Sequence, residues 1–250
     1  MSTTHIREHA FSLGTWISTG SPVVAELASQ YAFDWILIDF EHGATSDASM
    51  PEILRSVSHR PPAVIVRVPE LLPSLIARAL DWGADGIMLP HVRSAQEAAQ
   101  CVQAMRYPPD GCRGYSSSVR AYGYGTVPPA DPAKVHPLLF AQIEDLAGVN
   151  QSEAIATVNG VDVLFVGPAD LKLALANETV PEKPTFDDTL HRVAAAAAKH
   201  GKRAGILLRD HLQVDTLRTL GYSCIAVDSD LALLRQGYER LIRNFGHQED

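Results

Sequence analysis

The chain has 250 residues, of which 46% are hydrophobic and 20% are charged. These values are ordinary for a globular protein, and the length is sufficient for one well-packed core, so we expect a single domain over residues 1–250. The formal net charge of -8 argues against binding to phosphate backbones or anionic membranes. Nucleic acids and membranes are therefore not expected as partners.

The three cysteines, Cys101, Cys112 and Cys224, are odd in number and widely spaced. This spacing is typical neither of a disulfide framework nor of a CxxC metal site, so we expect buried free thiols. The first residues contain no apolar run of the length that a secretory signal needs, and no later segment approaches the roughly 18 apolar residues of a membrane span. We therefore expect a cytoplasmic enzyme.

Eight β-rich runs follow one another along the chain, separated by stretches with helical periodicity. The runs cover residues 13–17, 35–40, 63–68, 86–92, 138–144, 161–167, 203–208 and 224–228. Most are continuously apolar, as expected for strands that are covered on both faces. Eight strand–helix units in this length predict a single closed (β/α)8 TIM barrel, with an open doubly wound sheet as the alternative.

Residues 106–137, between the fourth helical stretch and the fifth run, interrupt this alternation with prolines, glycines and several serines. An irregular segment of this length in a compact domain usually serves a function. We interpret it as a functional loop or lid.

Ionisable and other polar residues gather where the expected strands end. They are Asp39, Glu41 and His42 after the second strand, Arg67 at the end of the third, Gln142 and Glu144 at the end of the fifth, and Asp170 after the sixth. The active sites of (β/α)8 barrels lie at the carboxyl ends of the strands, where the connecting loops converge. This end of the barrel is therefore the predicted site.

Glu144 and Asp170 come from neighbouring strands, so their carboxylates could hold one divalent cation between them. Two protein oxygens leave positions open for water and a chelating substrate, which favours Mg²⁺, Mn²⁺ or Co²⁺ over structural zinc. The alternative is that one or both carboxylates pair with arginines at the barrel rim.

His42 is the expected general base, because an imidazole titrates near neutral pH, and Asp39 could orient its ring or hold a bridging water. Arg67 is the one charged residue in an apolar run and needs an anionic partner. That partner could be a structural carboxylate or a substrate anion, and the strand-end position favours the substrate.

A turn follows the sixth strand and is built from Gly167, Pro168, Ala169 and Asp170. The glycine and the proline fix the turn, and the helix expected after it could present free N–H groups to an anion. Turns of this kind are common, so we treat the segment as a candidate binding element.

Six segments together resemble the HpcH/HpaI aldolase family, in matching order and over nearly the whole chain. They are LIDFEHG (37–43), VRVP (66–69), ALDWGADGIMLPHV (79–92), RYPPDGCRG (106–114), QIE (142–144) and GVDVLFVGPADL (160–171). The family contains class II, metal-dependent pyruvate aldolases, such as hydroxy-oxo-heptanedioate aldolase, with barrels of the phosphoenolpyruvate/pyruvate type. The resemblance implies reversible cleavage of a 4-hydroxy-2-oxo acid to pyruvate and an aldehyde, through a metal-stabilised enolate.

The resemblance also implies roles for individual residues. Glu144 and Asp170 match the metal ligands, His42 the base, Asp39 the assisting carboxylate, Arg67 the group at the pyruvyl oxygens, and Gln142 a residue lining the pocket. Asp81 matches a carboxylate that enters the site of a neighbouring subunit. The last helix of the family packs against a partner barrel, which implies a homo-oligomer, often a hexamer arranged as a trimer of dimers.

Two departures from the family lie near the expected pocket. Lys172 and Ala176 stand where the family has a serine and a later glycine, and Asp145 stands where threonine or serine is usual. These changes could alter the acceptor aldehyde, or shift the enzyme toward decarboxylation of oxaloacetate, which passes through the same enolate.

Three other functions compete with a metal-dependent aldolase. Lys172 could form a Schiff base with the substrate in a metal-free aldolase of the same fold. A relative of the citryl- or malyl-CoA lyases would share the barrel, but it needs additional basic residues to grip the nucleotide. A catalytically inactive binding protein would not need both a base and metal ligands.

Overall fold

The computed structural model describes residues 6–8, 10–57, 62–180, 182–209 and 211–245. Eight parallel strands form a closed barrel in chain order. They are β1 (Ser12–Ile17), β2 (Trp35–Asp39), β3 (Ala63–Arg67), β4 (Gly86–Leu89), β5 (Leu138–Ile143), β6 (Val163–Val166), β7 (Arg203–Leu208) and β8 (Tyr222–Ser229). Each of the eight expected runs overlaps one strand, so the predicted (β/α)8 barrel is confirmed.

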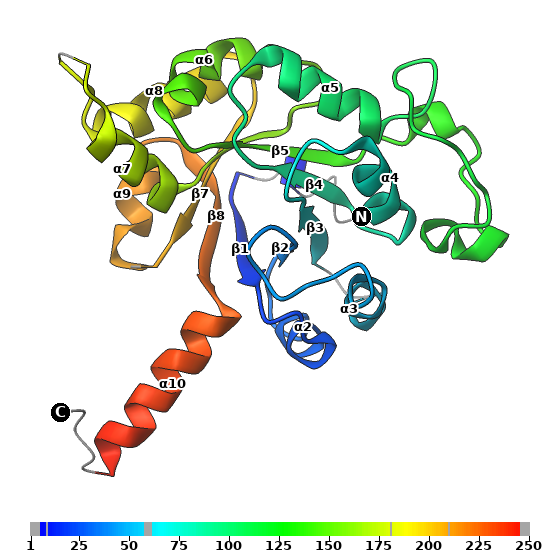
Figure 1. Cartoon of the computed structure of the whole chain (residues 1–250), viewed down its shortest axis with the longest axis horizontal. Coiled ribbons are helices and arrows are strands. Elements are labelled where there is room, and N and C mark those ends of the chain that lie inside the picture. The colour runs from blue at the N-terminus through cyan, green and yellow to red at the C-terminus, as the bar shows by residue number, and fades with distance from the viewer. Residues whose placement is uncertain (1–5, 9, 58–61, 181, 210, 246–250) are drawn as a thin grey trace.

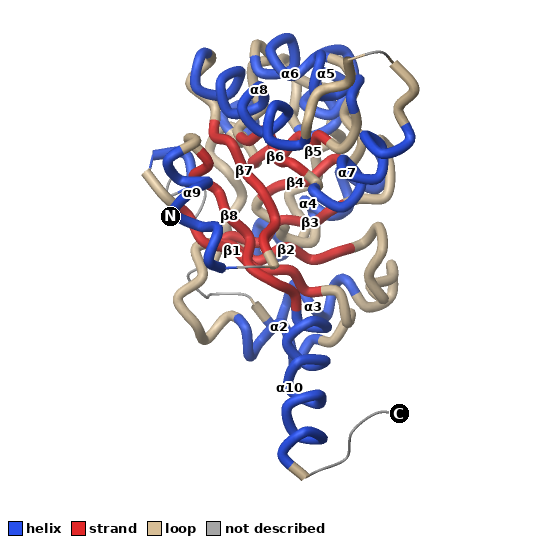
Figure 2. The backbone as a smooth tube through the Cα atoms, turned by 90° about the vertical axis from the view of Figure 1, so that its left-hand side faces the viewer, coloured by secondary structure: helices blue, strands red, loops and turns tan. Residues whose placement is uncertain are grey.

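Helices follow the strands, and all but the last surround the outside of the barrel (Figures 1 and 2). They are α2 (Pro22–Ala28), α3 (Met50–Ser56), α4 (Pro73–Asp81), α5 (Ala95–Met105), α6 (Leu146–Ala156), α7 (Pro168–Asn177), α8 (Phe186–Lys199), α9 (Val214–Thr219) and α10 (Asp230–Asn244). The side chains of Ser21, Ser94 and Thr185 cap α2, α5 and α8 by accepting the backbone N–H three residues later. In the described residues, no helix is both long and apolar enough to cross a membrane.

Aromatic side chains fill the interior of the barrel. The rings of Trp35 and Phe140 lie 5.3 Å apart between centroids, and those of Phe140 and Phe165 lie 6.1 Å apart. All three side chains are fully buried. Gly14 is required beside them, because a Cβ atom there would lie 2.1 Å from the Trp35 ring. This packed layer forms a closed floor beneath the carboxyl ends of the strands.

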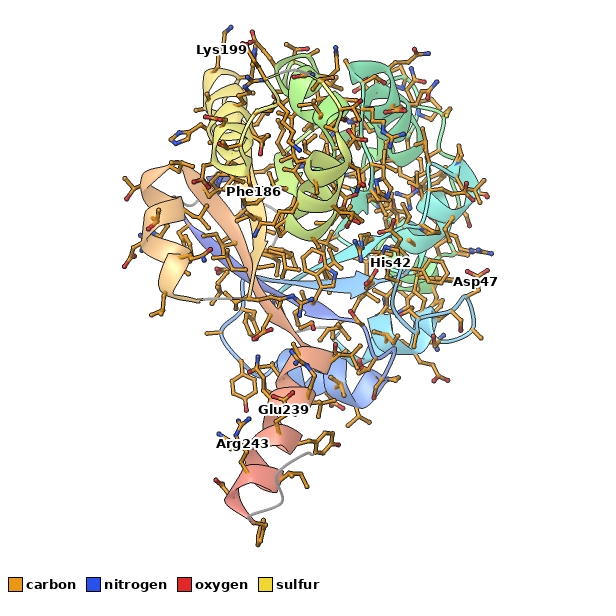
Figure 3. All side chains as sticks on the ribbon, turned by 60° about the vertical axis from the view of Figure 1, so that its left-hand side comes forward. His42, Asp47, Phe186, Lys199, Glu239 and Arg243 are labelled. Atoms are coloured by element: carbon orange, nitrogen blue, oxygen red, sulfur yellow. The ribbon has the colours of Figure 1, made fainter. Side chains whose placement is uncertain are left out.

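The last helix, α10, does not return to the barrel wall. It contacts β8 and β1 and then projects away from the barrel, where Figure 3 labels Glu239 and Arg243 on it (Figures 1–3). Its exposed large apolar side chains include Leu231, Leu234, Tyr238, Leu241 and Phe245. These residues recur at intervals of three or four, so they share one face of the helix. A long apolar stripe therefore has no partner within the described chain.

Residues 106–137 connect the end of α5 to the start of β5 and contain two short 3-10 helices, η1 (Arg120–Gly125) and η2 (Pro132–Lys134). A connection from a helix to the next strand lies at the amino ends of the strands, opposite the predicted site. The segment therefore does not connect strand ends at the predicted site of its own chain, and its interpretation as a functional loop or lid stays a prediction. Cys112 in this segment is exposed, contrary to expectation, whereas Cys101 and Cys224 are buried free thiols as predicted.

Candidate active site at the carboxyl ends of the strands

Arg67 and two carboxylates form an ion-pair cluster at the ends of β2 and β3. Strand register places Arg67 opposite Asp39, whose carboxylate accepts hydrogen bonds from Nε at 3.0 Å and Nη2 at 2.8 Å. A second carboxylate oxygen, Oε2 of Glu41, lies 2.9 Å from Nη1. Burial acts to lower the pKa of Arg67, but the hydrogen bond and charge of Asp39 and the charge of Glu41 outweigh it and raise that pKa.

These contacts correct one expectation about Arg67. The strand-end position favoured a substrate anion as its partner, whereas the chain itself supplies two carboxylates, because parallel pairing sets Asp39 beside it. The guanidinium also lies over the ring of Trp16, 5.5 Å from the ring centroid. Contact between Arg67 and a substrate stays a prediction.

His42 lies in the turn after β2 with its side chain 68% exposed. Asp39 accepts hydrogen bonds from the backbone N–H groups of Glu41 at 3.1 Å and His42 at 3.2 Å. The carboxylate near the imidazole is that of Glu41, with 3.8 Å between Nε2 and Oε2. Asp39 therefore orients the backbone of the turn. The sequence had suggested that it orients the His42 ring.

Glu144 follows β5 with its side chain 1% exposed, and both of its carboxylate oxygens are held. Oε1 accepts a hydrogen bond from Nε2 of Gln142 at 2.7 Å, and Oε2 accepts one from the backbone N–H of His91 at 3.0 Å. Burial raises the pKa of Glu144, and His91 opposes that rise, while the charges of Asp170 and Glu41 add to it. The carboxylate is thus both desolvated and crowded by other negative charge.

The donor set at this position fits a divalent cation held by few protein ligands. Glu144 is buried, and Asp170 is half-buried in the first turn of α7, where its charge acts on Glu144. Nearby, Oε1 of Gln142 is buried and has no hydrogen-bond partner in the described structure. Among the described residues no group of three or more His, Cys, Asp or Glu side chains could hold a metal ion. A cation at this position would have Glu144 and Asp170 as its carboxylate ligands, and this stays a prediction.

Gly167 precedes α7 and leaves the space that Glu144 occupies. A Cβ atom at this position would lie 2.3 Å from Oε1 of Glu144. No side chain caps the first turn of α7, Pro168 has no N–H to donate, and Ala169 is exposed. No side chain thus occupies the N-terminus of this helix, and binding of an anion there stays a prediction.

Asp81 lies at the opposite end of the barrel from these residues, because it ends α4 just before β4 begins. Its carboxylate pairs with Arg113, whose side chain is 2% exposed. Asp81 therefore cannot line the site of its own chain. A role in the site of another copy, as the resemblance implies, stays a prediction.

The two departures from the family have local structural explanations. Asp145 caps α6 and pairs with Arg93. Lys172 is exposed on α7 with its ammonium group 4.6 Å from the centroid of the Phe186 ring, and Ala176 is exposed on the same helix. Lys172 is therefore not among the side chains that gather at the strand ends, which argues against a Schiff-base mechanism.

His91 is the residue of this cluster that the sequence analysis missed. Its Nδ1 lies 3.3 Å from Oε2 of Glu144, and its Nε2 lies 3.6 Å from Oε1 of Glu41. Glu41 itself was noted at a strand end without a role. The same strand-end rule applied to residues 86–92 would have found His91, two residues after β4.

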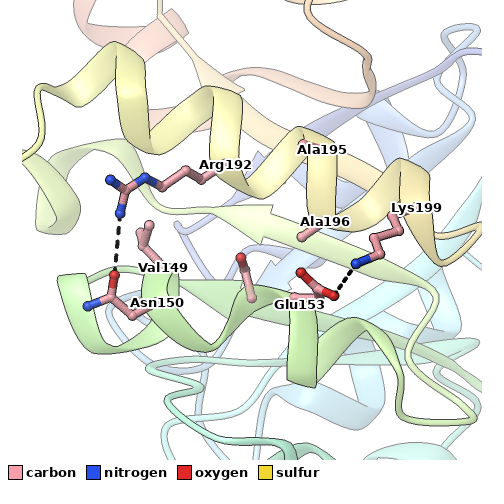
Figure 4. Close-up of a pocket in the computed structure, with 8 residues that line it drawn as sticks. Val149, Asn150, Glu153, Arg192, Ala195, Ala196 and Lys199 are labelled. Carbon is pink, nitrogen blue, oxygen red and sulfur yellow. Dashed lines mark hydrogen bonds and ion pairs between the residues drawn. The ribbon is translucent and has the colours of Figure 1, made fainter.

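A groove between α6 and α8 lies on the outside of the barrel, away from the strand ends (Figure 4). Arg192 bonds to Asn150 across it, and Lys199 pairs with Glu153. These contacts join two neighbouring helices. We therefore assign the groove to helix packing.

Known proteins share this architecture and sequence. The sequence profile of the HpcH/HpaI aldolase/citrate lyase family matches residues 12–237. A 5-keto-4-deoxy-D-glucarate aldolase from Klebsiella pneumoniae subsp. pneumoniae is 37% identical over 240 residues, which are 95% of this chain and 93% of that protein. The crystal structure of a HpcH/HpaI aldolase/citrate lyase family protein from Burkholderia cenocepacia has a TM-score of 0.88 at 33% identity and covers 97% of each chain.

A more distant structure shares the fold alone. The citrate lyase beta subunit from M. tuberculosis, complexed with oxaloacetate and magnesium, has a TM-score of 0.58 at 17% identity and covers 90% of this chain and 93% of its own. The family profile and the Klebsiella relative both extend over almost the whole chain. The chain therefore belongs to the HpcH/HpaI aldolase/citrate lyase family and is a carbon–carbon lyase.

Proposed function

We propose that this enzyme is a divalent-metal-dependent aldolase that cleaves a 4-hydroxy-2-oxo acid into pyruvate and an aldehyde. The observation that carries the proposal is the buried carboxylate of Glu144, whose pKa is raised by burial and by the charges of Asp170 and Glu41. Desolvated and crowded carboxylates are costly unless a cation neutralises them. Glu144 and Asp170 are the residues that hold it.

The bound cation supplies a Lewis acid that stabilises negative charge on the carboxylate and keto oxygens of the substrate. Mg²⁺, Mn²⁺ and Co²⁺ suit two carboxylate ligands with open positions. The magnesium in the citrate lyase beta subunit from M. tuberculosis supports a cation of this type on the same fold.

His42 is the proton-transfer group in the proposed reaction. Its exposed imidazole takes the proton of the C4 hydroxyl as the C3–C4 bond breaks. The bonding electron pair passes into the enolate of pyruvate, and the C4 fragment leaves as an aldehyde. Transfer of this proton from His42 to C3 then gives pyruvate and restores the neutral imidazole, and the reverse sequence forms the bond.

The remaining residues orient the substrate. Arg67, fixed by Asp39 and Glu41, places a positive charge beside the developing enolate. Gln142 lines the pocket next to Glu144. The turn of Gly167, Pro168 and Ala169 offers the backbone N–H groups at the start of α7 to the substrate carboxylate.

The proposed enzyme is a homo-oligomer in which one copy contributes residues to the site of another. The apolar stripe on α10 has the length and spacing to pack against a second copy of the barrel, and Asp81 faces away from the site of its own chain. We propose that α10 covers a neighbouring barrel and that Asp81 enters a neighbouring site, within a hexamer arranged as a trimer of dimers.

Pyruvate release from a panel of 4-hydroxy-2-oxo acids tests the proposed activity. The panel includes 5-keto-4-deoxy-D-glucarate, because the Klebsiella relative carries that name. We expect EDTA to abolish release from at least one substrate, and Mg²⁺, Mn²⁺ or Co²⁺ to restore it. Full activity after removal of metal would contradict the proposal.

Two further substrates separate this proposal from its alternatives. Oxaloacetate measures decarboxylation at the same site, and malyl-CoA measures release of acetyl-CoA. Faster turnover of either substrate than of every 4-hydroxy-2-oxo acid would assign the enzyme to that activity instead.

A further inference from the structure

His91 has an unusual backbone conformation at a strand end. It follows β4 with φ at 51°, in the left-handed region that residues other than glycine, asparagine, aspartate and histidine seldom adopt. With this conformation its N–H donates to Oε2 of Glu144 at 3.0 Å. The local backbone geometry is therefore tied to the orientation of the Glu144 carboxylate.

The imidazole of His91 lies between two carboxylates. Its Nδ1 is 3.3 Å from Oε2 of Glu144, and its Nε2 is 3.6 Å from Oε1 of Glu41. The carboxylate of Glu41 is 9% exposed and lies 2.9 Å from Arg67, whereas the imidazole is 49% exposed. One ring thus connects the Arg67 cluster to Glu144 at the rim of the site.

The contacts to Glu144 divide between its two oxygens. Gln142 donates to Oε1, His91 donates its N–H to Oε2, and the ring atom Nδ1 of His91 lies 3.3 Å from the same oxygen. A carboxylate oxygen has two lone pairs, so Oε1, which accepts one hydrogen bond, keeps capacity for a further partner. If the imidazole of His91 is removed, Gln142 is the remaining side chain that donates a hydrogen bond to the Glu144 carboxylate. The carboxylate then gains freedom to rotate.

We propose that His91 is a positioning residue whose N–H and ring fix the Glu144 carboxylate in the orientation that binds a divalent cation. The inference rests on the metal site proposed above and adds a residue to it. Groups that orient a metal ligand typically change metal affinity by about 10- to 100-fold when they are removed.

The variant His91→Gly separates the ring from the backbone. Glycine adopts a positive φ freely and keeps the N–H, so the variant removes the imidazole alone. We expect the Mn²⁺ dissociation constant of the full-length, metal-free protein, measured by titration calorimetry, to rise by about 10- to 100-fold. At saturating Mn²⁺ we expect kcat to return to within a few-fold of the wild-type value.

Two further variants sharpen the test. His91→Asn tolerates the same backbone conformation and keeps a side-chain N–H donor, so we expect it to recover part of the lost Mn²⁺ affinity. Glu182→Gly is the matched control, since Glu182 also has a positive φ, of 56°, and lies in an exposed turn between α7 and α8. We expect wild-type Mn²⁺ affinity from this control.

Mn²⁺ binding by the wild type and by His91→Gly separates a failure of the proposed metal site from a failure of the role of His91. If wild-type protein binds no Mn²⁺, the metal site itself is wrong. If wild-type protein binds Mn²⁺ and folded His91→Gly binds it equally well, the metal site stands and the role of His91 is wrong. A loss of kcat at saturating Mn²⁺ with unchanged affinity would also overturn the positioning role.

Discussion

The glycine at position 167 shows how a single side chain could block the site. A Cβ atom there would lie 2.3 Å from Oε1 and 2.7 Å from Cγ of Glu144. We predict that Gly167→Ala displaces the Glu144 carboxylate and lowers kcat/KM by about 10- to 100-fold, because the added methyl group acts on a proposed metal ligand. Steady-state kinetics at several Mg²⁺ concentrations checks this, and unchanged kinetics would show that Glu144 lies elsewhere.

The raised pKa of Glu144 has a consequence for stability in the metal-free protein. A carboxyl group whose folded-state pKa exceeds its unfolded value favours folding when protonated, and that contribution is lost as pH rises through the folded pKa. Burial is the main cause of the rise above the reference value of 4.5. Glu144→Gln removes this charge, so we predict that it gains stability over the wild type as pH increases above 4.5.

Denaturant unfolding of metal-free protein between about pH 4 and pH 8 measures this difference, because the pH slope of stability reports the protons taken up on folding. We expect the two proteins to converge at the acidic end, where Glu144 is protonated in both states. A difference in unfolding free energy that is independent of pH would contradict the raised pKa.

At the scale of elements, α10 carries an apolar stripe that no other part of the described chain covers. Its stripe includes Leu234, which is 42% exposed, and Leu241, which is 52% exposed. We predict that Leu234→Glu with Leu241→Glu lowers the oligomeric mass measured by light scattering while circular dichroism stays unchanged. Charges on this face would be buried without partners in an oligomer but remain solvated in a monomer.

Arg240→Glu provides the control for α10. Arg240 is exposed on the same helix but is not part of the apolar stripe. We expect this variant to keep the wild-type mass. If both variants keep that mass, α10 does not form the interface.

At the scale of the whole molecule, Asp81 and His42 lie at opposite ends of one barrel, so they can meet only between copies. We predict that His42→Ala and Asp81→Ala are each strongly impaired alone, by about 100-fold or more, as expected for loss of a proton-transfer group or its partner. Co-expressed mixed oligomers should regain activity, because some sites then combine an intact His42 with an intact Asp81. Activity equal to the sum of the separate variants would exclude this arrangement.

The sequence by itself determined the barrel and the end of it at which the proposed site residues gather. Eight apolar runs with intervening helical stretches sufficed, because strands buried on both faces leave few other arrangements. Chain order alone then places Asp39, Arg67, Glu144 and Asp170 at the same end, since parallel strands all point one way. The carbon–carbon lyase activity was likewise evident from the order of the six motifs.

Only the tertiary structure decided which groups touch. Register between β2 and β3 sets Asp39 against Arg67, so the carboxylate expected to orient His42 is committed elsewhere. The backbone of His91 turns through a positive φ toward Glu144, and the preference of histidine for this conformation is too weak to specify it from the sequence. Residues 106–137 lie at the amino ends of the strands and α10 leaves the barrel, because connection direction and helix packing are properties of the folded chain. Contacts between distant residues depend on strand register and loop conformation, and neither is encoded in the spacing of residue types.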